Sequence, residues 1–444
     1  MSPVGQERSA LAGLFLTCIS GPDQGKRIAL SAERLLVGRA SDCNLLSDDT
    51  EVPEYYASLT LEGDRLQIRA LSTTLPFVDG HPVTEATLTP GQQVRFGRSI
   101  WQVGVAQPGQ GVLAFVNRLG DQLTMVAGVE KPRDWNAREM FSDVVKHRTD
   151  DEIEDYFTVG TSQTTPPLAA IDARWPKPWV FGRVFTLSLI LYLGFVAAWN
   201  EFENLYLIPG LIMTGSVAIP FSLLILFFEV NVPRNISLYQ VIKLLLVGGL
   251  LSIVVSLFGF RWTGLDSWLG AASAGIIEET GKALALVLVV RRPKFRWTLN
   301  GLLLGATIGT GFAVFESAGY ALAAALSDGS DAMRDVIVKR GLLSVLGGHV
   351  VWTGLVGAAL WRVRGDRPFQ REMLTDPRFL RVFGLCVVMH MVWNAPLSIP
   401  FYGKFVLLGC AAWLLVLAFI QDGLKQVREA QAAEAAPTPS PAAA

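Results

Sequence analysis

The chain lacks the sequence signatures of several common protein classes. It has four cysteines in 444 residues, and their wide spacing, at Cys18, Cys43, Cys386 and Cys410, predicts neither a zinc cluster nor a disulfide framework. It has no His-Glu-x-x-His motif, which excludes the zinc membrane proteases built on that helix turn. The formal net charge of −1 argues against nucleic-acid binding, and no nucleic-acid partner is expected.

Long hydrophobic runs are confined to one part of the chain. Residues 1–177 carry charges and turn residues throughout, whereas most of 178–422 consists of apolar runs long enough to cross a lipid bilayer. We therefore predict a C-terminal all-α polytopic membrane domain at 178–422. Its eight transmembrane helices are expected at 180–199, 205–228, 239–258, 268–290, 299–326, 341–361, 380–398 and 402–421.

Basic residues are concentrated in two of the connecting loops. By the positive-inside rule these loops are cytoplasmic, and an even number of spans then places both termini in the cytoplasm. The protein is expected to be a multi-pass protein of the cell (inner) membrane. The loops concerned contain Arg291, Arg292, Lys294 and Arg296, and Arg362, Arg364, Arg367, Arg371 and Arg378.

The N-terminal region, 13–105, contains many short strand-like runs separated by turn residues, which predicts an all-β sandwich. It resembles the forkhead-associated (FHA) family, a resemblance that implies a cytoplasmic domain recruiting a protein or peptide. The matching segments are Gly38-Arg39, Cys43-Asn44-Leu45, Val52 to Leu59, Phe77-Val78-Asp79-Gly80 and Gln93 to Gly97.

The FHA-like region departs from its family where phosphothreonine would bind. Arg39 is retained, but Pro53 stands where the family has a serine and Tyr56 where it has a structural histidine. Proline offers neither a side-chain donor nor a backbone N–H, so two potential hydrogen bonds to a phosphate are missing. We expect the fold without the family's usual phosphothreonine recognition.

Two further segments complete the predicted organisation. The connector at 106–177 is expected to contain a hairpin at Gly111–Val126 and a helix from Asn136 to Tyr156. The Ala- and Pro-rich tail at 429–444 is predicted to be disordered.

Six ionisable side chains lie inside the apolar runs. A charge at bilayer depth costs about 2.5–3.5 kcal/mol even on the lenient insertion scale, so such groups pair, line a cavity or do chemistry. None is an aspartate, which argues against an aspartyl protease. Glu278 and Lys282 are spaced i,i+4 and are expected to pair, and similar spacings join Glu316 to Tyr320 and His390 to Asn394. The six are Glu278, Glu279, Lys282, Glu316, His349 and His390.

Four motifs on four successive spans resemble those of the PrsW family of membrane proteases, within the CAAX-protease and bacteriocin-processing superfamily. They are Glu278-Glu279-x-x-Lys282, Phe315-Glu316-x-x-x-Tyr320, His349 and His390-x-x-x-Asn394. The resemblance covers roughly 180–422. It implies an intramembrane peptidase whose substrate is a membrane protein, such as an anti-sigma factor.

The chemistry of such a set follows from its parts. A buried glutamate can accept a proton from water and return it, and the family pattern favours Glu278 over Glu279 for this task. His349 can help to hold the water, and His390 with Asn394 can donate hydrogen bonds to the oxyanion. Lys282 would keep one glutamate ionised. Glu316 is expected to orient a partner, with Tyr320 as a hydrogen-bonding neighbour.

Other functions stay open at this level. The polar residues could form an ion network that only packs helices in a signalling scaffold, or a relay in a proton-coupled transporter. We predict no metal or other cofactor, although a His/His/Glu zinc site is geometrically open.

Overall fold

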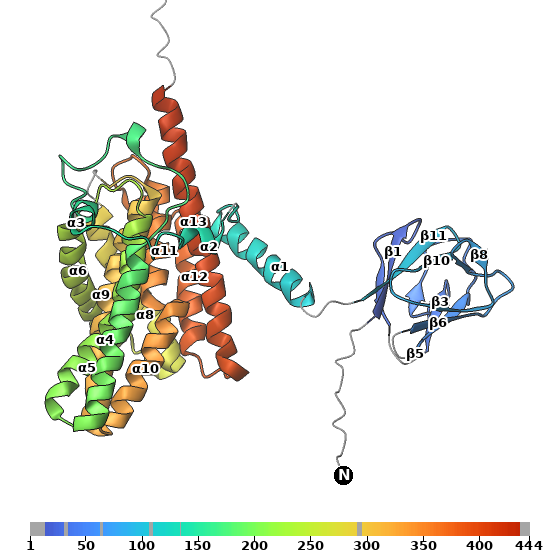
Figure 1. Cartoon of the computed structure of the whole chain (residues 1–444), viewed down its shortest axis with the longest axis horizontal. Helices are drawn as coiled ribbons and strands as arrows, with labels where there is room; N and C mark the ends of the chain where they lie inside the picture. Colours follow the sequence, from blue (N-terminus) through green and yellow to red (C-terminus); the bar gives the residue numbers. More distant parts are fainter. Residues whose placement is uncertain are drawn as a thin grey trace, which may run out of the picture. The chain divides into compact units, whose positions relative to one another are not determined.

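The computed structural model describes residues 14–30, 34–62, 65–105, 110–133, 135–290 and 295–435. The chain divides into two compact units, Met1–Asn117 and Arg118–Ala444. Figure 1 shows strands in the first unit and a helical bundle in the second. The predicted fold class, an FHA-like sandwich followed by an all-α membrane domain, is confirmed.

The first unit is a sandwich of two sheets. One has the strand order β2-β1-β11-β10-β7-β8 and the other the order β4-β3-β5-β6-β9. Apart from the parallel pair of β3 and β4, the paired strands run antiparallel. The strands are β1 (Leu14–Ser20), β2 (Arg27–Ala29), β3 (Leu35–Gly38), β4 (Leu45–Leu46), β5 (Ala57–Glu62), β6 (Arg65–Ala70), β7 (Phe77–Val78), β8 (His81–Pro82), β9 (Glu85–Leu88), β10 (Gln93–Phe96) and β11 (Ser99–Val105).

Alternating side chains build the core between the two sheets. Leu16, Leu59, Ile68 and Trp101 point inward from different strands and are fully buried, as the period of two in a half-buried strand requires. Asp49, in the loop before β5, is also buried, and its carboxylate accepts the backbone N–H of Arg98 at 2.6 Å. Apolar packing and such loop anchors together fix the sandwich.

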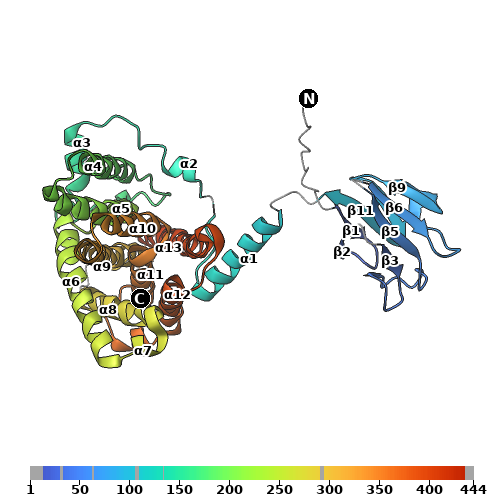
Figure 2. The same ribbon diagram turned by 90° about the horizontal axis from the view of Figure 1, so that it is seen from below.

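The second unit is a helical bundle, with short 3₁₀ turns at several helix ends. Figure 2 shows α9 and α11 inside it, with α4, α5, α6, α8, α12 and α13 around them. The helices are α1 (Gln110–Ala127, which begins in the first unit), α2 (Ala137–Met140), α3 (Asp150–Phe157), α4 (Val180–Phe202), α5 (Ile208–Val230), α6 (Leu238–Thr263), α7 (Asp266–Leu269), α8 (Ser273–Val290), α9 (Thr298–Ser327), α10 (Ser330–Leu346), α11 (Gly348–Arg364), α12 (Pro377–Asn394) and α13 (Gly403–Ala435).

Glycines on α9 allow α11 to approach it backbone to backbone. A Cβ atom at Gly305 would lie 2.1 Å from the carbonyl oxygen of Thr353, and one at Gly309 would lie 2.2 Å from that of His349. No side chain fits in these gaps. Small residues permit such close approach between helices in lipid, and here they hold the start of α11 against the middle of α9.

Six helical stretches in the described residues are long and apolar enough to cross a membrane, so the predicted count of eight is not confirmed. The two predicted spans that fall short correspond to α8 and α12. Three charged residues within the 18 of α8 lower its apolar character. The six are Val180–Phe202, Leu205–Val230, Leu238–Thr263, Thr298–Ser327, Ser330–Arg364 and Pro400–Ala435.

The connector and tail differ from their predictions. Gly111–Val126 is not a hairpin but lies in α1, because its apolar residues recur every three or four positions, as in Leu119 and Leu123. The helix expected from Asn136 to Tyr156 is two short helices, α2 and α3, the first capped by Asn136. Helix α13 continues past Glu429 to Ala435, into the predicted disordered tail, and 436–444 lie outside the described residues. So do Arg291, Arg292 and Lys294 of the predicted cytoplasmic loop.

Candidate active site

A pocket of about 620 Å³ lies among α8, α9, α10, α11 and α12. Five of the six predicted ionisable residues lie in or beside this pocket and are joined by hydrogen bonds or ion pairs: Glu279, Lys282, Glu316, His349 and His390. The sixth, Glu278, lies beside both histidines. Tyr320 and Asn394 also line the pocket. The structure therefore brings together the eight residues to which the sequence analysis gave a role in the site.

Three of the site residues lie near helix ends rather than at helix centres. His349 is the second residue of α11, and Glu278 lies five residues after the start of α8. His390 lies four residues before the end of α12. The span predicted at 341–361 lies within the candidate stretch Ser330–Arg364 but is not one continuous helix, because α10 ends at Leu346 and α11 begins at Gly348. Gly348 has φ +71°, a left-handed conformation that glycine adopts without strain.

One half of the site joins α8 to α12. Lys282 Nζ donates to Glu279 Oε1 at 2.5 Å, and both side chains are fully buried. His390 Nδ1 lies 2.9 Å from the same oxygen, and because a carboxylate can only accept, His390 donates. The expected pairing of Lys282 with Glu278 is therefore not seen, since Lys282 binds the other glutamate at i,i+3.

The other half joins α9, α10 and α11. Glu316 Oε2 lies 2.9 Å from His349 Nε2 and also accepts from Arg340 Nη2. His349 Nδ1 lies 2.9 Å from Lys282 Nζ, so the lysine connects the two halves. Sequence analysis missed Arg340, because it lies in a segment whose charges indicated an outer loop; this segment is the helix α10.

Glu278 faces the space between the two histidines. Its Oε2 atom is buried and has no hydrogen-bond partner. This oxygen lies 3.9 Å from His349 Nδ1 and 3.8 Å from His390 Nε2. Since His390 donates through Nδ1, its Nε2 atom presents a lone pair toward the glutamate.

These three residues fit a divalent metal ion. One ligand atom from each of Glu278, His349 and His390 lies within 4.8 Å of the other two, and two imidazoles with one carboxylate form a ligand set that zinc uses. Each histidine also directs its second ring nitrogen at a carboxylate, the outer arrangement common around metal ligands. A cation bound there would replace the contact of Lys282 with His349 Nδ1.

In the first unit, Arg39 is already engaged by the backbone. Its Nε atom donates to the carbonyl oxygen of Val52 at 2.6 Å. Tyr56 is almost fully buried, and its hydroxyl donates to the carbonyl oxygen of Leu75 at 2.8 Å. Burial raises the pKa of Tyr56 above its usual value. Tyr56 is thus a core residue, and Pro53 leaves no hydroxyl beside Arg39.

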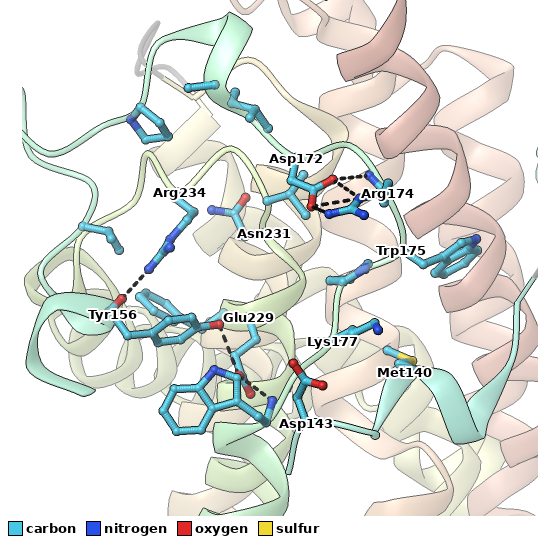
Figure 3. A pocket seen from close by; sticks show the side chains of 18 of the residues that line it. Met140, Asp143, Tyr156, Asp172, Arg174, Trp175, Lys177, Glu229, Asn231 and Arg234 are labelled. Atoms are coloured by element: carbon cyan, nitrogen blue, oxygen red, sulfur yellow. Dashed lines mark hydrogen bonds and ion pairs between the residues drawn. The ribbon is translucent and has the colours of Figure 1, made fainter. Parts of the chain in front are cut away.

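A second cavity, of about 840 Å³, lies where the connector packs on the bundle (Figure 3). At its base the buried Glu229 carboxylate accepts the backbone N–H groups of Trp179, Val180 and Phe181 at 2.7–2.9 Å. The Tyr156 hydroxyl donates to Glu229 at 3.2 Å, and burial raises the pKa of this tyrosine. The glutamate thus ties α3 and the start of α4 to the end of α5. A lone charge ending an apolar run was the only sequence signal for it.

Comparisons with known proteins match both units. Residues 233–421 match the family described as PrsW family intramembrane metalloprotease, and residues 17–107 match the family described as inner membrane component of the type III secretion system, cytoplasmic domain. FHA domain-containing protein FhaB of Mycobacterium tuberculosis is 32% identical over 98 residues, which are 22% of this chain and 63% of that protein. The match thus leaves over a third of FhaB uncovered.

Two solved structures resemble the first unit. One comes from a structural and functional analysis of phosphothreonine-dependent FHA domain interactions; it is 26% identical, with a TM-score of 0.20, and the match covers 21% of this chain and 95% of that one. The other is the cytoplasmic domain of the sorting platform protein PscD from P. aeruginosa, 20% identical with a TM-score of 0.20, covering 21% of this chain and 81% of that one. By the family matches, residues 233–421 are similar to the PrsW protease family, and an FHA-like domain precedes them in the chain.

Proposed function

We propose that the protein is an intramembrane endopeptidase whose reaction centre is formed by Glu278, His349 and His390. The observation that supports this most is the buried Glu278 Oε2 atom, which has no partner and faces both imidazoles in a pocket large enough for water and a peptide. A scaffold that only packs helices would need no pocket of this size beside the two histidines.

The residues divide the work according to their contacts. Glu278, the free carboxylate, accepts a proton from the attacking water and returns it to the leaving amine. Glu279, neutralised by Lys282, orients His390, and Glu316 orients His349. Because His390 donates through Nδ1 to Glu279, its other nitrogen is an acceptor.

Asn394 is therefore the better oxyanion donor. It lines the pocket one helical turn beyond His390. Tyr320 lines the pocket next to Arg340, whose guanidinium lies over the tyrosine ring. We propose that it contacts the substrate chain.

A metal ion would be held by Glu278, His349 and His390, and Glu278 would then be a ligand instead of the free base. When bound, such an ion polarises a water molecule and the scissile carbonyl. Elemental analysis of purified protein, with and without a chelator, tests this part separately from the proteolysis itself.

We propose that substrate enters from the outer side of the membrane. Asp266, Lys339 and Asn394 line the pocket at one end of the bundle. The connector packs at the other end, where Arg362, near the end of α11, binds the Gly128 carbonyl and Gln421 of α13 binds that of Lys131. The distance from His349 to Arg362 along α11 is about 20 Å at 1.5 Å per residue. The predicted topology makes the connector end cytoplasmic and the pocket end external.

Substrate trapping tests the proposal. Membrane proteomes are compared between cells with the wild-type protein and cells with Glu278→Gln, with Glu201→Gln, an exposed carboxylate at the end of α4, as the matched control. We expect one or more membrane proteins to accumulate uncleaved only with Glu278→Gln. Full turnover in both Glu278→Gln and Glu279→Gln would contradict the glutamate mechanism. An anti-sigma factor among the trapped proteins would identify the substrate class that the family resemblance implies.

A further inference from the structure

Arg340 is a cation of the buried network that belongs to none of the four sequence motifs. It lies on α10, near the break between α10 and α11. Its guanidinium is held in three ways: Nη2 donates to Glu316, Nε donates to Ser317 Oγ at 3.0 Å, and the carbon centre lies 4.6 Å from the Tyr320 ring centroid. Its partners all belong to one face of α9.

This contact continues directly to the reaction centre. Glu316 Oε2, the oxygen that accepts from Arg340, also accepts from His349 Nε2 at 2.9 Å. With Nε2 used in this way, Nδ1 is the nitrogen that His349 turns toward Glu278. The position of the Glu316 carboxylate therefore decides which edge of the imidazole faces the pocket.

Glu316 needs a second partner to stay in this place. Its side chain lines the pocket and retains 17% exposure, so water competes for its oxygens. Lys282 is occupied by Glu279 and His349, which leaves Arg340 as the cation that contacts Glu316 among the described residues. A guanidinium presents a planar fork that can donate to two oxygens and stack on a ring at once, whereas a lysine ammonium is a point charge without this fixed geometry.

We infer that Arg340 is a positioning residue, which clamps the Glu316 carboxylate so that it holds the His349 ring with Nδ1 toward Glu278. This inference rests on the proposed function of the same site. It predicts that α10, a helix outside the four family motifs, determines the geometry of the reaction centre without contacting the reacting atoms.

The first experiment needs neither substrate nor metal. Full-length protein labelled with ¹⁵N-histidine is reconstituted in lipid nanodiscs, and exchange of ring N–H protons with solvent is measured by NMR at about pH 8, where an ordinary imidazole is neutral. The chain has four histidines, so a His349→Asn variant assigns the signal. The His390 ring N–H, bound to Glu279, is the internal reference.

We expect a slowly exchanging His349 ring N–H in the wild type, exchanging about tenfold faster in Arg340→Met, with partial protection restored in Arg340→Lys. The exchange rate of the His390 ring N–H should be unchanged in both variants. The matched control is Arg334→Gln. Arg334 lies on the same helix as Arg340, but its side chain binds Asn200 and Asp331. A His349 signal equally protected in Arg340→Met and wild type would overturn the inference, as would equal loss of protection at both histidines, which indicates general unfolding.

Zinc titration of the same samples gives a second measurement. Removing an outer partner of a metal ligand typically lowers metal affinity 10–100-fold, and we expect a decrease of about tenfold in Arg340→Met. If the wild type bound no zinc, the proposed metal ligands would be wrong, but the exchange result would still decide the role of Arg340. The two failures are therefore distinguishable.

Discussion

Replacement of Glu229 by alanine should loosen the attachment of the connector to the helical bundle. The carboxylate accepts three backbone N–H groups from the start of α4, at 2.8, 2.9 and 2.7 Å, and one hydroxyl from Tyr156. A hydrogen bond to a charged group contributes about 1.5–3 kcal/mol, and these bonds share one acceptor group, so their effects do not add fully. In the alanine variant, water from the adjacent 840 Å³ cavity can hydrate some of the backbone N–H groups that have lost their carboxylate acceptor. We therefore expect Glu229→Ala to lower the free energy of unfolding by about 3–5 kcal/mol.

Two milder variants separate the contributions. Glu229→Gln keeps an accepting oxygen but loses the charge, and should cost about 1–2 kcal/mol. Tyr156→Phe removes the hydroxyl bond alone and should cost about 1 kcal/mol. Glu201→Ala, at an exposed carboxylate, is the control and should cost nothing measurable.

The assay compares apparent melting temperatures of the detergent-solubilised full-length protein at one fixed scan rate, because membrane proteins often unfold irreversibly. At about 2–4 °C per kcal/mol, Glu229→Ala should lower the apparent Tm by about 10 °C. Limited proteolysis should at the same time cut faster within 158–178. A shift of less than about 2 °C, with unchanged proteolysis, would refute the reasoning and show that the start of α4 needs no cap from Glu229.

Three further predictions concern other parts of the chain. Calorimetry of the full-length protein should detect no phosphothreonine-dependent peptide binding, because Pro53 offers no donor and Arg39 is bound to Val52; micromolar binding that disappeared on dephosphorylation and in Arg39→Ala would contradict this. Reporter fusions after 170 and 370 should be cytoplasmic and those near 203 and 401 external, and one discordant fusion would remove the argument that substrate enters from outside. The hydrogen bonds from Arg378 lower the pKa of Asp376 to about 2, so its contribution to stability is present above its unfolded pKa of about 3.9 and is lost as the pH falls from about 4 to 2. Unfolding of Asp376→Asn should lack this part of the pH dependence.

The sequence predicted the residues of the candidate site better than their contacts. Ionisable side chains in apolar runs are conspicuous because lipid makes them costly, so Glu278, His349 and the others could be selected without a structure. Their pairing could not be predicted in this way, because Glu279 and Glu278 lie i,i+3 and i,i+4 from Lys282 and both spacings bring side chains together. The choice between them depends on His390, which reaches Glu279 from another helix.

The errors in the fold have equally local causes. The part of helix α10 before residue 341 carries charges such as Asp331, Asp335 and Lys339, which favour a loop between two predicted spans, and Arg340 was overlooked with it. Helix α8 was counted as an ordinary span although its charged residues reduce its hydropathy. The sandwich was easier to predict, because alternation of period two leaves a direct mark on the sequence of each strand.

The unequal helix lengths around the site have a consequence for the surrounding lipid. Helix α8 has 18 residues and its outward-facing neighbour α6 has 26, which correspond to about 27 and 39 Å. Exposed side chains such as Leu284 and Leu288 show that α8 has an outward apolar face. A bilayer that matches the longer helices must become thinner beside α8 to cover this face and no more. The acyl-chain length of the host membrane would then set how deeply the pocket mouth lies below the headgroups, and lipid composition would control access to the pocket.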